Sequence, residues 1–87
     1  MKEVDLINLG FTRINQTAED SGTSNDWYYY QYELGSFCLI SSASYEIEND
    51  EWFVDIFESP EIRFTNLTEV SILLTLLTNN YTETYNL

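Results

Sequence analysis

The pattern of hydrophobic and polar positions predicts β-strands in the middle of the chain. Alternation is clearest in 51–58, where the apolar residues on one face of a strand are Trp52, Val54 and Ile56. The segment 27–34 alternates in the same way and is rich in tyrosine, a residue common in strands. Because one face of each segment is apolar, we expect both strands to pack that face on a core.

Weaker signals predict further strands on either side of these two. The segment 37–44 begins as an apolar run directly after Gly35, so it is predicted to form a hairpin with the strand before it. The segment 11–16 reads as a short strand. A possible edge strand covers 61–65, directly after Pro60, because proline cannot donate a hydrogen bond to a sheet. We therefore expect an antiparallel sheet of three or four strands.

Helical spacing of apolar residues occurs at the two ends of the chain. Residues 3–9 carry apolar side chains on one side and precede Gly10, a residue type that readily ends a helix. In 67–79 the apolar residues form a broad stripe. Asn66, with Glu69 three residues later, resembles a capping box at the start of this second helix.

The order of these elements predicts one α+β domain that spans 1–87. At 87 residues the chain is shorter than the usual domain of about 100–150 residues, so we expect one core. The C-terminal helix should cover one face of the sheet, because an uncovered sheet is marginal in water. Turn-forming residues predict an exposed loop over 17–26, and 81–87 is predicted to be a tail. The residues expected to supply most of the core are Leu6, Leu9, Phe11, Leu34, Leu39, Trp52, Val54, Ile56, Val70, Leu73, Leu74 and Leu77.

The charge of the chain restricts its partners. Fifteen Asp and Glu against three Lys and Arg give a net charge of −12, with no histidine. Direct binding of nucleic acid or of an anionic membrane is therefore excluded, because both need clustered cations. No stretch approaches the roughly 20 apolar residues that cross a bilayer, so we expect a cytoplasmic protein. The expected partner is a basic protein surface.

Few residues are suited to catalysis or metal binding. The absence of histidine and the single cysteine, Cys38, exclude the usual triads and zinc sites. Cys38 lies in an apolar run and is expected in the core. The acidic turn 46–51 lacks the spacing of a calcium-binding loop, so it is interpreted as a solvated turn. We expect no enzymatic activity, no metal site and no cofactor.

Two hypotheses for function remain. In the first, the acidic residues around 46–61 bind a basic nucleic-acid groove of an enzyme, as a DNA-mimicking inhibitor of the phage type would. These candidate partner-binding residues are Glu46, Glu48, Asp50, Glu51, Asp55, Glu58 and Glu61. In the second, the chain is a structural or regulatory interaction domain, with a homodimer as one possibility. Its contact residues would be Ile72, Leu76, Tyr28 and Tyr30.

The contact residues of the second hypothesis lie on two predicted elements, a helix and a strand. Ile72 and Leu76 lie on the back of the predicted helix, opposite its main stripe. Either a partner covers them, or the N-terminal helix or the tail 81–87 does. The tyrosines are of a type enriched in interfaces, although strand propensity alone also explains them.

Overall fold

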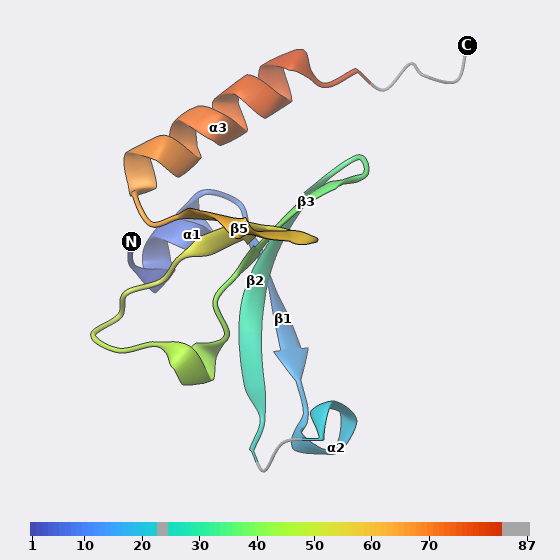
Figure 1. The fold of residues 1–87 in the computed structure, drawn as a ribbon, viewed down its shortest axis with the longest axis vertical. Coiled ribbons are helices and arrows are strands. Elements are labelled where there is room, and N and C mark those ends of the chain that lie inside the picture. Colours follow the sequence, from blue (N-terminus) through green and yellow to red (C-terminus); the bar gives the residue numbers. More distant parts are fainter. Residues whose placement is uncertain (23–24, 83–87) are drawn as a thin grey trace.

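The computed structural model describes residues 1–22 and 25–82 of the chain (Figure 1). The elements, in order, are α1 (Glu3–Asn8), β1 (Thr12–Gln16), α2 (Ala18–Ser21), β2 (Trp27–Leu34), β3 (Phe37–Ser41), the 3-10 turn η1 (Ser44–Glu46), β4 (Val54–Ile56), β5 (Ser59–Phe64) and α3 (Leu67–Asn80). The α+β class is confirmed, with a short N-terminal helix and a C-terminal helix. The sheet has five strands where three or four were expected.

The sheet is an antiparallel meander in which each strand pairs with its neighbours in sequence, in the order β1-β2-β3-β4-β5. Gly35 takes a positive φ of 63° in the β2–β3 turn, as a tight hairpin turn requires. The β4–β5 turn lies at Phe57 and Glu58, within the strand predicted for 51–58, and Glu58 has a φ of 71°. Pro60 lies within β5, an edge strand, where its missing N–H is tolerated.

Two strands are shorter than predicted, because side-chain hydroxyls and the N-terminal segment accept backbone N–H groups that would otherwise bond to a neighbouring strand. β3 ends at Ser41, since the backbone N–H of Tyr30 donates to Ser41 Oγ at 2.8 Å instead of to a carbonyl. Beyond it, the N–H of Tyr28 donates to Ser44 Oγ at 3.0 Å, and the chain turns into η1. β4 begins at Val54 because the N–H of Trp52 donates to the carbonyl of Met1 at 2.7 Å.

The predicted loop 17–26 contains a short helix, α2, that the sequence pattern did not indicate. The N–H of Ala18 donates to Asp26 Oδ1 at 2.7 Å and satisfies one of the free donors at the start of the helix. The N–H of Gly22 donates to the carbonyl of Ala18 at the other end. A partner eight residues away supplies this cap, so local periodicity carries no sign of it.

The core lies between the two terminal helices and one face of the sheet. α1 contributes Leu6 and α3 contributes Val70 and Leu74, which pack with Leu39 and Val54 of the sheet. Of the expected core residues, seven are buried, namely Leu6, Phe11, Leu39, Trp52, Val54, Val70 and Leu74. Four others are partly buried against this cluster, namely Leu9, Ile56, Leu73 and Leu77. The prediction for Leu34 is not met, because Leu34 is half-buried at the end of β2, outside the cluster.

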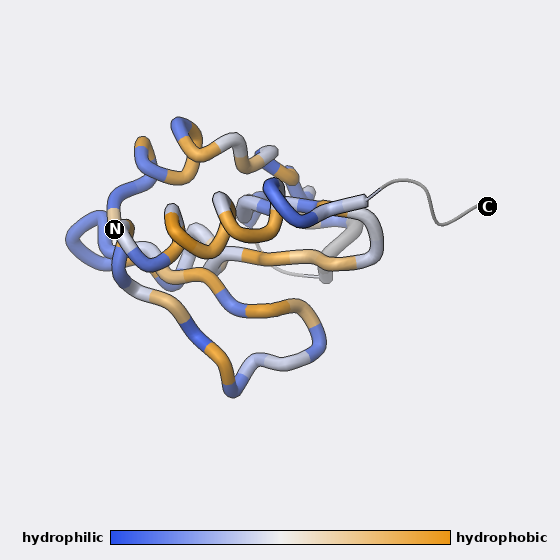
Figure 2. Tube along the Cα trace, turned by 90° about the horizontal axis from the view of Figure 1, so that it is seen from above, coloured by the Kyte–Doolittle hydropathy of each residue, from blue (hydrophilic) through white to orange (hydrophobic). Residues whose placement is uncertain are grey.

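The outer side of α3 carries exposed apolar residues among polar ones. Figure 2 shows hydrophobic positions along the length of this helix, which leads to the C-terminus. Ile72 and Leu76 are 54% and 57% exposed, so within the described residues neither α1 nor the start of the tail covers them. Tyr81 instead lies against the β2–β3 turn, with its ring 2.9 Å from the position that a Cβ on Gly35 would take.

None of the helices formed by the described residues combines the length and the hydrophobicity needed to cross a membrane.

Candidate partner-binding surface

Neither α1 nor α3 packs on the second face of the sheet, which we call the helix-free face. The strand register places on this face Ile14 from β1, Tyr29 and Gln31 from β2, Cys38 and Ile40 from β3, Asp55 from β4 and Arg63 from β5. Successive side chains of a strand point to opposite faces, so these residues lie opposite the helix-covered core. This face therefore has apolar and aromatic side chains that neither α1 nor α3 covers.

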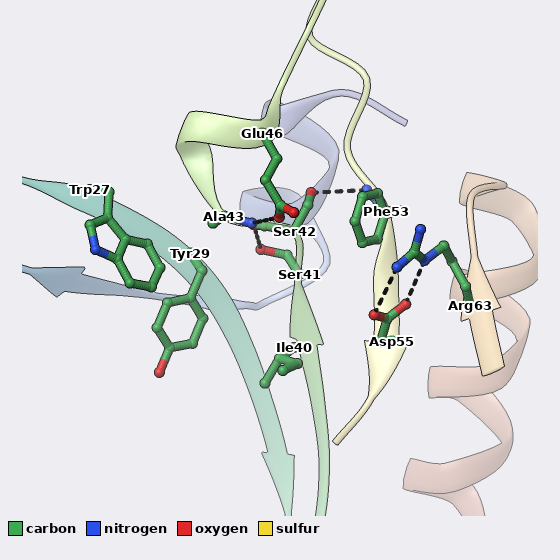
Figure 3. Close-up of a pocket in the computed structure, with 10 residues that line it drawn as sticks. All are labelled: Trp27, Tyr29, Ile40, Ser41, Ser42, Ala43, Glu46, Phe53, Asp55 and Arg63. Atoms are coloured by element: carbon green, nitrogen blue, oxygen red, sulfur yellow. Dashed lines mark hydrogen bonds and ion pairs between the residues drawn. The ribbon is translucent and has the colours of Figure 1, made fainter. Parts of the chain in front are cut away.

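A hollow of about 370 Å³ lies on this face (Figure 3). Trp27 and Tyr29 form its wall on the β2 side, with ring centroids 5.9 Å apart, and Phe53 stands across from them. Ile40 lies between the two walls. Glu46, Asp55 and Arg63 also line it, and we call this hollow the open-face groove.

A second hollow of about 380 Å³ adjoins the open-face groove. The two share Tyr29 and Ile40, so they follow one another along β2 and β3. Glu33, Cys38 and Phe57 line the second hollow. Neither hollow is lined by a residue of α1 or α3. The two hollows together form a continuous depression along β2 and β3 on the helix-free face.

The open-face groove already holds one guanidinium group. Arg63 donates to both carboxylate oxygens of Asp55, at 2.9 and 3.4 Å, and its guanidinium lies 3.7 Å from the centroid of the Phe53 ring. The hydrogen bond to Asp55 raises the pKa of Arg63, and the charge of Glu46 acts in the same direction. Glu46 Oε1 accepts from the N–H of Ala43 at 2.9 Å. Two carboxylates and one guanidinium leave the groove with a formal charge of −1.

The seven acidic residues predicted to bind a partner occupy three settings. Glu46 and Asp55 line the open-face groove. Asp50 supports the fold, since its Oδ1 accepts from the N–H of Glu3 at 3.2 Å and from the indole N–H of Trp52 at 3.0 Å. The remaining four are exposed: Glu48 and Glu51 in the loop before β4, Glu58 in the β4–β5 turn and Glu61 on β5.

The prediction that Tyr30 contacts a partner is wrong, because this residue is 2% exposed and belongs to the core. Its hydroxyl donates to Glu3 Oε2 at 2.6 Å. Tyr28 faces the same side and is half-buried, with the guanidinium of Arg13 at 3.6 Å from its ring centroid and the ring of Trp52 stacked at 6.0 Å. Trp27, Tyr29 and Phe53 are aromatic residues that lie on the opposite face, where they line the open-face groove. Strand alternation separates the two sets, although it does not tell which set faces the core.

Cys38 was expected in the core, and this prediction is also wrong. Leu39 faces the core, so Cys38 points to the open face, where it is half-buried. Burial raises the pKa of the Cys38 thiol, and Glu33 adds to the effect, so the reactive thiolate is disfavoured. Within residues 1–22 and 25–82, no group of three or more His, Cys, Asp or Glu residues is placed to hold a metal ion.

No protein-family model matches the chain, and comparisons with curated proteins and with solved structures found no significant match. A function therefore has to be inferred from the residues of this chain and their placement.

Proposed function

We propose that the chain is a small, non-catalytic acidic module that binds a basic surface of another protein, and that this surface is a nucleic-acid-binding groove. The observation that carries the proposal is the charge of −12, which the cations of the chain leave almost uncompensated. Among the described acidic residues, only Asp55 pairs with a Lys or Arg side chain. Lys2 reaches the carbonyl of Asn49, and Arg13 reaches Asn15 Oδ1.

Exposed carboxylates near the β4–β5 hairpin support this proposal. Glu48, Glu58 and Glu61 are exposed, and their charges are available to a partner. A groove that binds duplex nucleic acid is built for about one negative charge per 1.7 Å of helix axis. A dense set of carboxylates on a small domain provides a similar field, which would direct the module to such a groove.

A second candidate function is a structural or regulatory interaction domain that binds its partner, or a second copy, through the outer side of the helices. The observation in its favour is the exposure of Ile72 and Leu76 on α3, together with that of Val4 and Ile7 on α1, at 55% and 53%. In this case the acidity would only keep the protein from aggregating.

The test is capture of basic nucleic-acid-binding proteins from lysate at increasing salt, with fragmented duplex DNA as a competitor. The charge variant is Glu58→Gln with Glu61→Gln, and the matched control is Glu19→Gln with Glu69→Gln. Each pair changes the net charge from −12 to −10. The four side chains are exposed, so neither pair should disturb the fold.

We expect a nucleic-acid-binding protein to be retained at low salt and released by salt or by DNA, because the Debye length falls from about 10 Å at 0.1 M to about 3 Å at 1 M. With an exposed ion pair contributing about 0.2–1 kcal/mol, the charge variant should bind about 2- to 30-fold more weakly, and the control should lose less. Retention that is unaffected by salt, by DNA and by the charge variant would refute the proposal.

A further inference from the structure

We infer that the open-face groove binds an arginine side chain of the basic partner. This inference rests on the proposed function and assigns a site to it. The groove lies on the helix-free face, where Tyr29 of β2 and Ile40 of β3 are brought together by the sheet and no segment of the described chain covers them. A partner segment could therefore reach it without displacing a helix.

The shape and the chemistry of the groove suit a planar cation. Its walls are the aromatic rings of Trp27 and Tyr29 on one side and of Phe53 on the other (Figure 3). Aromatic faces attract cations, and the flat guanidinium group of arginine stacks on them better than the compact ammonium group of lysine. The volume of about 370 Å³ is ample for one long side chain.

The internal ion pair shows how such a group is held on this face. Arg63 stacks on Phe53 and makes two hydrogen bonds to Asp55, so an aromatic ring and a carboxylate together hold its guanidinium. The groove contains a second set of the same two components, because Trp27, Tyr29 and the carboxylate of Glu46 also line it.

Charge complementarity identifies the occupant as a cation. Asp55 and Arg63 neutralise each other, so the charge of Glu46 is left unbalanced within the groove. Glu46 uses Oε1 to accept the N–H of Ala43, and no hydrogen bond from residues 1–22 or 25–82 occupies its second oxygen. Glu33 adds a further negative charge in the adjoining hollow. An arginine that stacks on Tyr29 would balance Glu46 and bury its stem against Ile40.

The test uses two peptides of equal charge, hexa-arginine and hexa-lysine, with blocked ends, titrated at low salt into ¹⁵N-labelled protein. We expect hexa-arginine to bind about two- to fivefold more tightly than hexa-lysine, because stacking on an aromatic face favours the guanidinium. The indole N–H signal of Trp27 should shift, and that of Trp52, which is 3% exposed in the core, should not.

Three variants separate the contributions. Tyr29→Thr removes a wall and should bring the ratio of the two affinities close to one. Glu46→Gln keeps an oxygen for the N–H of Ala43 and should weaken binding of both peptides by a similar factor. Leu76→Ser, on the outer side of α3, is the control and should change neither affinity.

Equal binding of the two peptides by the unmodified protein, or an unchanged ratio in Tyr29→Thr, would overturn the assignment of the groove. If both peptides then bind with shifts at the β4–β5 hairpin and are weakened by Glu58→Gln with Glu61→Gln, the acidic module stands and only the arginine site is wrong. If neither peptide binds at low salt, the arginine site and the proposed attraction to basic proteins both fail.

Discussion

Replacement of Tyr30 by phenylalanine should lower stability by an amount that depends on pH. The Tyr30 hydroxyl is buried and donates to Glu3 Oε2 at 2.6 Å, so Tyr30→Phe removes a hydrogen bond to a charged acceptor. Such bonds contribute about 1.5–3 kcal/mol. We therefore expect the free energy of unfolding at neutral pH to fall by about this amount.

The pH dependence follows from the pKa of Tyr30. Burial, followed by the hydrogen bond to Glu3 and its charge, raises this pKa from 10.0 to about 12. The unfolded chain has the ordinary value of about 10, so it loses the proton first. The stabilisation is therefore complete below pH 10 and is lost as the pH rises to about 12. In total it amounts to about 3 kcal/mol, of which about half is lost by pH 11.

The assay is urea unfolding, followed by circular dichroism, of the unmodified protein and the variant at about pH 7 and pH 11. The difference between the two proteins should shrink by about 1–2 kcal/mol at the higher pH, because phenylalanine has no proton to lose. Tyr45→Phe, at a position 68% exposed, is the control for loss of a solvated hydroxyl. A Tyr30→Phe difference that is the same at both pH values would refute the reasoning.

Three further predictions concern individual contacts. Trp52→Phe should lower the free energy of unfolding, measured by thermal unfolding, by about 2–3 kcal/mol, because a hydrogen bond and buried area are lost. Trp27→Phe should lower it by less than about 1 kcal/mol, since the Nε1 of Trp27 is buried without a partner among the described residues. Equal losses would contradict this. Gly35→Ala should lower the free energy of unfolding by about 1–2 kcal/mol, because φ is +63° and the new Cβ would meet the ring of Tyr81. An unchanged melting temperature would show that the turn adapts. Leu76→Glu should change monomer stability by less than about 0.5 kcal/mol. A larger loss that depends on concentration in sedimentation experiments would show that a second copy covers the outer side of α3.

The element types were predictable because they depend on local spacing. The stripe of apolar residues in 67–79 and the cap at Asn66, whose Oδ1 accepts the N–H of Glu69 at 3.0 Å, both appear in α3. The ends of strands were less predictable. β3 stops at Ser41 because hydroxyl groups take the place of backbone acceptors, and such contacts join residues that lie far apart in the sequence.

The candidate site was predictable only in part. Its acidic members Glu46 and Asp55 belong to the acidic residues around 46–61 that the sequence indicated. The aromatic walls were not predicted, because the predicted contact residues Tyr28 and Tyr30 lie on the face of β2 that packs on the core. The signal that could have found them was present, since Phe53 and Asp55 alternate with the core residues of the same strand.

The sequence by itself determined the charge of the chain, the order of its helices and strands, and the pairing of alternate side chains into two faces. Those properties depend on residue type and on neighbours in the chain. Only the tertiary structure decided which face of the sheet is covered. Both faces of β2 are aromatic. Because alternation alone does not distinguish them, either face could have been the buried one. The packing of α1 and α3 on the side of Tyr30 chose between them and left Trp27 and Tyr29 on the uncovered face.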